Sequence, residues 1–249
     1  MNIALVGYGN MGKRIHALSE EAGHTVELIL DEHNNINGAG INSEAFKNID
    51  VAIDFSHPEV VTDNLKKVLL LRIPVVVGTT GWLDHKSDIE QMRNQYDGKL
   101  LYGSNFSVGV QLFAKLIQRA GALFGNNAMF DAALHEVHHT QKADAPSGTA
   151  TTLAEHWLKE ADDKTSIQNG VPEKGRVDPG KFYVTSQRLG SVFGEHQLRI
   201  NSPFDDIEIT HRARSRDAFA SGAIKAAEWL HKQEKPGFYL IENIVEELA

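Results

Sequence analysis

The 249-residue sequence contains no cysteine. This absence excludes a disulfide scaffold, a metal site built on thiolates and a cysteine nucleophile. No apolar run approaches the roughly 18 residues that a membrane span requires. The first ten residues, MNIALVGYGN, also lack the basic start of a secretory signal. We therefore expect no membrane partner and a cytoplasmic location.

Basic residues are also fewer than acidic residues. Lys and Arg number 25 against 33 Asp and Glu, so the formal net charge is −8. Such a balance argues against a nucleic-acid partner. The remaining composition, 41% apolar and 23% charged, is typical of a globular protein long enough for one domain or two.

The first hundred residues alternate short β-branched runs with helical patterns. The expected strands are Ile3–Val6, Thr25–Leu30, Val51–Phe55, Pro74–Val77 and Leu100–Tyr102, and the expected helices are Asn10–Ala22, His57–Leu71 and Asp84–Tyr96. Strands that alternate with helices of this length indicate βαβ units. The predicted fold class is therefore α/β, with a Rossmann-like, doubly wound parallel sheet.

The pattern changes after residue 106. We expect helices over Val108–Phe124, Ser147–Lys159 and Asp217–Lys232, an ambiguous segment over Met129–His139, a polar surface loop over 161–180, and strands over Phe182–Arg188, Ser191–Ile200 and Asp206–His211. This order predicts a second, α+β domain with a mostly antiparallel sheet. If the last helix returns to the first domain, that domain comprises residues 1–106 and 216–249, and the second comprises residues 107–215.

A glycine-rich loop follows the first expected strand and opens the first expected helix. Residues 7–12, GYGNMG, fit the pattern G-x-G-x-x-G, which lets the backbone approach a pyrophosphate at a helix N-terminus. Asp31 ends the second expected strand, where a carboxylate can bind ribose hydroxyls. The glycines alone are also compatible with an ordinary turn. Their position between strand and helix, together with Asp31, favours a dinucleotide-binding domain.

The residues after Asp31 bear on which dinucleotide binds. The 2′-phosphate of NADP requires a cation near the ribose, but Glu32 follows Asp31 directly. Two adjacent carboxylates disfavour a phosphate dianion. Lys13 and Arg14 are the only basic residues nearby in the sequence. We predict that NADH is preferred and that any use of NADPH depends on Lys13 or Arg14.

Residues 135–150 form the segment richest in chemically active side chains. Its histidines can act as acid or base near neutral pH, and Lys142 is a cationic acid when protonated. Pro146–Thr149 precedes an apolar helix, so its backbone N–H groups can bind an anion. Cations beside a helix N-terminus suit a substrate that carries carboxylates.

Two other interpretations of this segment stay open. Residues 135–139, HEVHH, also match H-E-x-x-H, in which a helix would let His135 and His139 hold zinc with Glu136 as base. Pro146 close behind disfavours that helix, and we expect no metal. The segment could also be the solvated end of a strand. A protein that senses a dinucleotide without catalysis is a further alternative, although it has no need of Lys142 or of the anion loop.

Residues Glu136–Ala150, with the pattern E-x-H-H-x-x-K-x-D-A-P-S-G-T-A, resemble the signature of the 4-hydroxy-tetrahydrodipicolinate reductases, also called dihydrodipicolinate reductases. Five further segments resemble motifs of that family in the same order: VAIDFS at 51–56, GTTG at 78–81, NFSVG at 105–109, ITHRA at 209–213 and FASGA at 219–223. The resemblance covers nearly the whole chain. The sequence departs from the family at Asn10 and Glu32, where basic residues are common.

The resemblance implies an oxidoreductase of lysine and diaminopimelate biosynthesis. The expected reaction is the NAD(P)H-dependent reduction of 4-hydroxy-tetrahydrodipicolinate to tetrahydrodipicolinate. The expected partner is therefore a small-molecule substrate, a cyclic imine with two carboxylates. The family also implies a homotetramer that forms through the sheet of the second domain, which becomes the substrate-binding and tetramerisation domain.

The resemblance further implies roles for individual residues. His138 matches the proton donor/acceptor of the family and Lys142 its proton donor, whereas His139, Gly148 and Thr149 match positions that bind substrate. The positions that match cofactor contacts are Gly7, Tyr8, Gly9, Asn10, Met11, Gly12, Asp31, Gly78, Thr79, Thr80, Gly103, Ser104, Asn105 and Phe106.

Overall fold

The computed structural model describes residues 1–172 and 174–248. Glu173, which lies within the expected surface loop, and Ala249 fall outside the described residues. The chain forms two compact units. Unit 1 contains Met1–Val108 and the chain from Arg216, and unit 2 contains Gly109–Ser215. No helix among the described residues is both long enough and apolar enough to cross a membrane.

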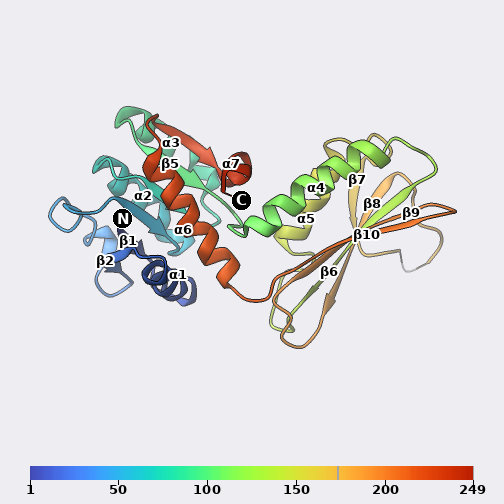
Figure 1. The fold of residues 1–249 in the computed structure, drawn as a ribbon, viewed down its shortest axis with the longest axis horizontal. Helices are drawn as coiled ribbons and strands as arrows, with labels where there is room; N and C mark the ends of the chain where they lie inside the picture. The colour runs from blue at the N-terminus through green and yellow to red at the C-terminus, as the bar shows by residue number, and fades with distance from the viewer. Residues whose placement is uncertain (173, 249) are drawn as a thin grey trace. The chain divides into compact units, whose positions relative to one another are not determined.

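Unit 1 is built on a six-stranded sheet (Figure 1). All five pairings are parallel, so the carboxyl ends of the strands meet at one edge. Every residue of the third and fourth strands is buried, as is typical of a parallel sheet covered on both faces. In the order β11-β5-β4-β3-β1-β2, the strands are Gly237–Leu240, Lys99–Tyr102, Val75–Val77, Val51–Asp54, Asn2–Val6 and Thr25–Leu30.

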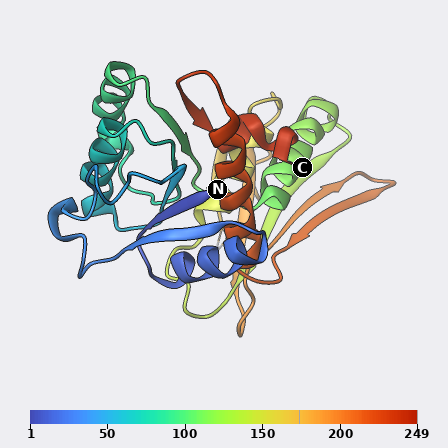
Figure 2. The same cartoon turned by 60° about the vertical axis from the view of Figure 1, so that its left-hand side comes forward.

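Helices pack on both faces of this sheet (Figure 2). The helices α1, α6 and α7 share one core with the odd-numbered residues of β1, and α2 and α3 share another with its even-numbered residues. An ion pair between Arg14 and Asp217 joins the starts of α1 and α6, although 203 residues separate them. The helical bounds are Asn10–Glu21 (α1), Pro58–Leu70 (α2), Lys86–Gln95 (α3), Asp217–Lys232 (α6) and Ile241–Leu248 (α7), with short 3-10 turns at Ile36–Gly38 (η1) and Leu83–His85 (η2).

Unit 2 contains a five-stranded sheet in the order β10-β9-β6-β8-β7. Its elements are α4 (Val108–Phe124), β6 (Asp131–His138), α5 (Gly148–Leu158), β7 (Ser166–Asn169), β8 (Lys181–Arg188), β9 (Glu195–Asn201) and β10 (Asp206–Arg212). Even-numbered residues of the three inner strands pack against α4 and α5, for example Leu134, Val184 and Leu198. Because side chains alternate along a strand, Glu136, His138 and His196 lie on this same face.

The predicted antiparallel character holds for half of the second sheet. Strand β9 is antiparallel to both of its neighbours, whereas β8 is parallel to β6 and to β7. The sheet is therefore mixed. The parallel pairs follow from the connections: the chain leaves β6, passes through α5 into β7 and continues into β8, and these three strands run in the same direction.

Several elements differ from the sequence prediction, among them β7, β9, β11 and the last helix, α7, for which nothing was predicted. Residues 161–180, expected to be a loop, contain β7, a polar edge strand with no alternating apolar pattern. Strand β9 begins at Glu195 instead of Ser191, because the preceding residues form a turn. Strand β11 was not expected at all, since its four residues carry too short an apolar run to distinguish from a loop.

Candidate active site

The glycine loop lies where β1 ends and α1 begins, as predicted. Gly7 has a positive φ of 95°, and a Cβ there would lie 2.3 Å from the carbonyl oxygen of Phe55. At Gly12 a Cβ would lie 2.2 Å from the carbonyl oxygen of Gly7. Neither position can hold a side chain without moving backbone. The loop is therefore a cradle of bare backbone at the N-terminus of a helix, which fits a pyrophosphate.

A pocket of about 530 Å³ lies beside this loop. Gly7, Tyr8, Gly9, Asp31 and Glu32 are among its lining residues. The Oδ1 atom of Asp31 accepts backbone hydrogen bonds from residues 33 and 34, at 2.9 and 3.2 Å. The first of these bonds is the main cause that lowers the pKa of the Asp31 carboxyl, so the group is ionised at neutral pH. A pocket with a glycine cradle at one end and a fixed carboxylate at the other fits an adenosine diphosphate group.

The other predicted cofactor residues lie at the same edge of the sheet. Gly78, Thr79 and Thr80 follow β4 directly, and residues 103–106 follow β5. Asn10, Met11 and Gly12 are in the first turn of α1. In open α/β sheets, ligands bind beyond the carboxyl ends of the strands, near the point where the strand order reverses. Here that point is between β1 and β3.

Asp54 is a residue of this site to which sequence reasoning gave no role. It ends β3, is almost fully buried, and accepts hydrogen bonds from the Thr79 hydroxyl (2.7 Å), the Ser56 hydroxyl (2.8 Å) and the Ser56 N–H (3.0 Å). Burial raises the pKa of the Asp54 carboxyl, and these hydrogen bonds oppose that shift. Asp54 therefore fixes the start of the Gly78–Gly81 loop. The available signal was an acid at the end of an otherwise apolar strand.

In unit 2 the segment around residue 136 is a strand, which overturns the zinc interpretation based on H-E-x-x-H. On a strand, His135 and Glu136 point to opposite faces. The Nδ1 atom of His135 lies 2.8 Å from the Thr185 hydroxyl, on the face away from the helices. His139 lies beyond the end of β6. The pair that would have held zinc with Glu136 as its base does not face that carboxylate.

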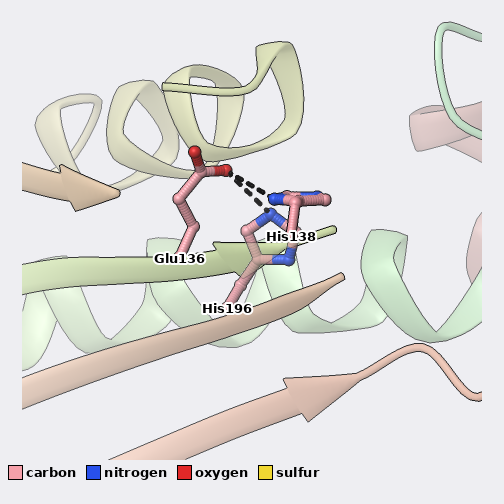
Figure 3. A group of neighbouring side chains, drawn as sticks. All are labelled: Glu136, His138 and His196. Atoms are coloured by element: carbon pink, nitrogen blue, oxygen red, sulfur yellow. Dashed lines mark ion pairs between the residues drawn. The ribbon is translucent and has the colours of Figure 1, made fainter. Parts of the chain in front are cut away.

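Glu136 and His138 lie together instead, with His196 of β9 beside them (Figure 3). The antiparallel register pairs Glu136 directly with His196. The Oε1 atom of Glu136 accepts hydrogen bonds from the N–H of Ser147 (3.0 Å) and from Arg188 (3.3 Å). Burial acts to raise the pKa of the Glu136 carboxyl, but hydrogen bonds from His138, Ser147 and Ser186 outweigh it and lower that pKa. Glu136 is therefore a buried carboxylate that stays ionised.

Arg188 connects the loop that contains Lys142 to the Glu136 carboxylate through hydrogen bonds. Its guanidinium donates to Glu136, to the carbonyl of Lys142 (3.3 Å) and to the carbonyl of Asp144. The Lys142 ammonium lies 2.7 Å from Oδ1 of Asp144. The hydrogen bond from Lys142 is the main cause that lowers the pKa of the Asp144 carboxyl. A cationic loop is thus held against the end of β6.

The N-terminus of α5 lies beside the end of β6 as well. Ser147 is buried and caps this helix, because its hydroxyl accepts the N–H of Ala150 at 3.1 Å. Gly148 and Thr149 follow as the first residues of the helix, at the positive end of its dipole. Since the N–H of Ser147 donates to Glu136, one carboxylate fixes both the helix start and the end of β6. His138, Lys142, Gly148 and Thr149, predicted as site residues, thereby come from elements held together by Glu136 and Arg188.

Among the described residues, Glu136, His138 and His196 are the group whose ligand atoms are close enough to hold a metal ion, within 4.8 Å of one another. The Arg188 guanidinium already lies 3.3 Å from this carboxylate and supplies the positive charge that it needs. Sequence reasoning missed both His196 and Arg188. Each is polar and lies near the end of a strand distant in the sequence, so only the register of the sheet brings it here.

Comparison with known proteins adds an independent line of evidence. Residues 1–106 match the family model for the N-terminus of dihydrodipicolinate reductase, and residues 109–245 match the model for its C-terminus. The 4-hydroxy-tetrahydrodipicolinate reductase of Christiangramia forsetii is 37% identical over 248 residues, covering 100% of this chain and 99% of the relative. That of Staphylococcus carnosus is 35% identical and covers 98% and 99%.

A solved structure has the same fold. The chain aligns with a dihydrodipicolinate reductase from Paenisporosarcina sp. TG-14, determined with dipicolinate bound, at a TM-score of 0.77. The alignment covers 98% of this chain and 99% of that one, with 23% sequence identity. Both units of the present chain therefore have counterparts in one known enzyme.

Proposed function

The chain belongs to the dihydrodipicolinate reductase family, and we propose that His138 and Lys142 supply the proton for its reaction. As a member it is an oxidoreductase that reduces 4-hydroxy-tetrahydrodipicolinate to tetrahydrodipicolinate in lysine biosynthesis, with a pyridine nucleotide as cofactor. The observation that carries the proposed roles is the convergence on Glu136 and Arg188. Through these two residues, the end of β6, the Lys142 loop and the N-terminus of α5 are held together.

Unit 1 is the proposed cofactor-binding domain. The cradle formed by Gly7–Gly12 would hold the pyrophosphate, and Asp31 would accept the ribose hydroxyls. Both of these hydrogen bonds to the Asp31 carboxylate end on Oδ1, so Oδ2 would be the oxygen that accepts the ribose hydroxyls. Residues 78–80 and 103–106 would line the nicotinamide side. When bound, the reduced nicotinamide supplies the hydride.

Unit 2 is the proposed substrate-binding domain. The N–H groups of Gly148 and Thr149 would hold a substrate carboxylate at the positive end of the α5 dipole, with His139 as a further contact. Loss of the 4-hydroxyl group as water leaves a ring carbon conjugated with the C=N bond, and hydride addition to that carbon then moves an electron pair toward the imine nitrogen. Lys142 or His138 then delivers the proton that neutralises this developing negative charge, and the nearby ammonium stabilises it electrostatically.

These roles are tested in an assay that generates the substrate by condensing pyruvate with aspartate semialdehyde and follows oxidation of the cofactor. We expect Lys142→Met and His138→Gln to lower kcat by roughly 10²- to 10⁴-fold, the usual contribution of a positioned acid. His139→Asn should mainly raise KM for the substrate. Lys159→Met, at the other end of α5, is the matched control and should leave both constants unchanged. Full activity of both the Lys142 and His138 variants would refute the assignment.

The preference for NADH is also a proposal. It rests on Asp31 and Glu32, which both line the cofactor pocket with negative charge. NADPH would remain a weaker alternative. The relevant measurement is the ratio of kcat/KM for the two cofactors at equal salt.

We propose further that the protein is a homotetramer. Helices α4 and α5 pack on one face of the sheet of unit 2, and the odd-numbered face, which carries His135, Thr185 and Gln197, meets neither of them. That face is the proposed contact between subunits. Sedimentation velocity would report a mass near four times 27.5 kDa. A cytoplasmic location is proposed because the reaction consumes reduced pyridine nucleotide, and cell fractionation would test it.

A further inference from the structure

The buried carboxylate of Glu136 has a second oxygen whose surroundings differ from those of the first. Oε1 accepts hydrogen bonds from Ser147 and Arg188. Oε2 lies 3.1 Å from Nδ1 of His138 and 3.8 Å from Nε2 of His196 (Figure 3). Among the described residues, Oε2 and Nδ1 of His138 are both buried atoms with no hydrogen bond to any other group, and their 3.1 Å ion-pair contact is the nearest that either makes. Because buried polar atoms are almost always paired, these two atoms belong to each other.

Only one proton arrangement satisfies this pair. An ionised carboxylate accepts hydrogen bonds and donates none, so Nδ1 of His138 must carry a hydrogen. In the neutral imidazole the other nitrogen, Nε2, is then the basic one, and in the imidazolium it is the one that gives up its proton. The carboxylate thus selects which nitrogen of His138 exchanges protons, and it stabilises the imidazolium when that forms.

His196 does not compete for this role. Burial, followed by the neighbouring His138, lowers the pKa of His196 to about 4. His196 is therefore neutral near pH 7, and its ring meets that of His138 edge to face, with centroids 5.2 Å apart. The charged groups around His138 are Glu136 on the same strand, Arg188 at the end of β8 and Lys142 in the loop. His211 on β10 acts on the cluster through His196.

The surroundings of Nε2 agree with this assignment. Gly194 lies beside it, and a Cβ on that glycine would be 3.0 Å from Nε2. The turn before β9 therefore passes this nitrogen without placing a side chain against it. Nδ1 faces the carboxylate, whereas Nε2 faces the backbone of Gly194.

We propose that Glu136 is a positioning residue of the reductase, which holds the proton on Nδ1 of His138 and so presents Nε2 to the substrate. This inference rests on the proposed role of His138 in proton transfer. Arg188 completes the arrangement, because it balances the charge of Glu136 through the other oxygen and leaves Oε2 to the imidazole.

The decisive variant is Glu136→Gln, which keeps the shape of the side chain and loses its charge. Its amide nitrogen can donate to Nδ1 and thereby stabilise the opposite tautomer. We expect kcat to fall by about 10²-fold or more, with KM for the substrate changed less than about threefold. The matched control is Glu228→Gln in unit 1, which also removes the charge of a glutamate that contacts a histidine, at 2.8 Å. This control should retain the kcat of the unaltered chain.

A second readout reports the proton itself. Nitrogen-15 NMR of the histidine side chains, with His138 assigned from the His138→Gln variant, should show a protonated Nδ1 and an unprotonated Nε2 at neutral pH. In Glu136→Gln this pattern should change. The wild-type spectrum alone can overturn the inference: a neutral His138 with its proton on Nε2 does so, even if the variant fails to fold.

The remaining outcomes separate the two proposals. If His138→Gln loses activity but Glu136→Gln keeps it, the positioning role fails and the catalytic role stands. If His138→Gln keeps full activity, the catalytic role fails, whereas the spectrum still tests the pairing. If the purified enzyme holds one equivalent of zinc and loses its activity with a chelator, the three side chains are metal ligands and the inference is wrong.

Discussion

The proposed preference for NADH rests on two adjacent carboxylates. Asp31 and Glu32 line the same pocket, and Glu32 is exposed, with the His33 ring 3.6 Å from its carboxylate. We therefore choose Glu32→Arg as the perturbation. It replaces a negative charge by a positive one beside the 2′ position and leaves Asp31 available for the ribose.

The expected size follows from Coulomb's law. A carboxylate about 4 Å from a phosphate dianion in water, partly screened by salt, corresponds to roughly a 10- to 30-fold preference for the unphosphorylated cofactor. Reversing a second charge at about 6 Å should then move the ratio by about tenfold toward NADPH. The same reversal at Glu27, four residues earlier on β2, lies about 13 Å from Asp31, beyond the screening length.

The assay compares kcat/KM for both cofactors in the wild type, Glu32→Arg and Glu27→Arg at physiological ionic strength. The wild type should favour NADH by at least about tenfold, and only Glu32→Arg should shift that ratio. In high salt the shift should shrink, because the interaction is between exposed charges. A wild type that favours NADPH would refute the reasoning, as would an equal shift in Glu27→Arg.

Two further changes have predictable effects. Gly12→Ala would place a Cβ 2.2 Å from the Gly7 carbonyl oxygen, so the loop must move by about 1 Å. We expect kcat/KM for the cofactor to fall about 100-fold. An unchanged NADH affinity in a fluorescence titration would contradict this. His196, with its pKa lowered from 6.5 to about 4, binds its proton in the unfolded chain before the folded one as pH falls through this window. The folded state should therefore lose about 2–3 kcal/mol between pH 7 and 4.5, and urea unfolding of His196→Asn should show a smaller loss than the wild type.

Much of unit 1 could be predicted because its signals are local. A parallel strand buried on both faces is a short apolar run, and the glycine loop between Val6 and the first helix can adopt few structures. The structure confirms the predicted Rossmann-like parallel sheet. Strand β11 was not predicted, because four residues after a proline are too few to show an alternation of apolar and polar side chains. The cofactor contacts at individual residues stay predictions, since the structure shows their positions and not their ligand.

The family and its reaction were also predictable, because ordered motifs over nearly the whole chain resemble one family and the comparisons confirm it. The architecture of unit 2 was less so. Its sheet mixes parallel and antiparallel pairs, and β6 pairs with β8 and β9, which lie far from it in the sequence, so no local pattern indicates these pairings. β7 is polar because it is an edge strand, so the alternation that reveals inner strands is missing from it.

The segment around Glu136 shows why a motif does not define a site until the periodicity of the backbone is known. On a helix, HEVHH would place His135 and His139 on one face. On the strand that forms, the period of two places Glu136 with His138 instead. The register then adds His196 from β9, and Arg188 from β8, two residues that no local pattern links to Glu136. The same five residues thus place a carboxylate beside the imidazole of His138, instead of pairing His135 with His139 as a helix would.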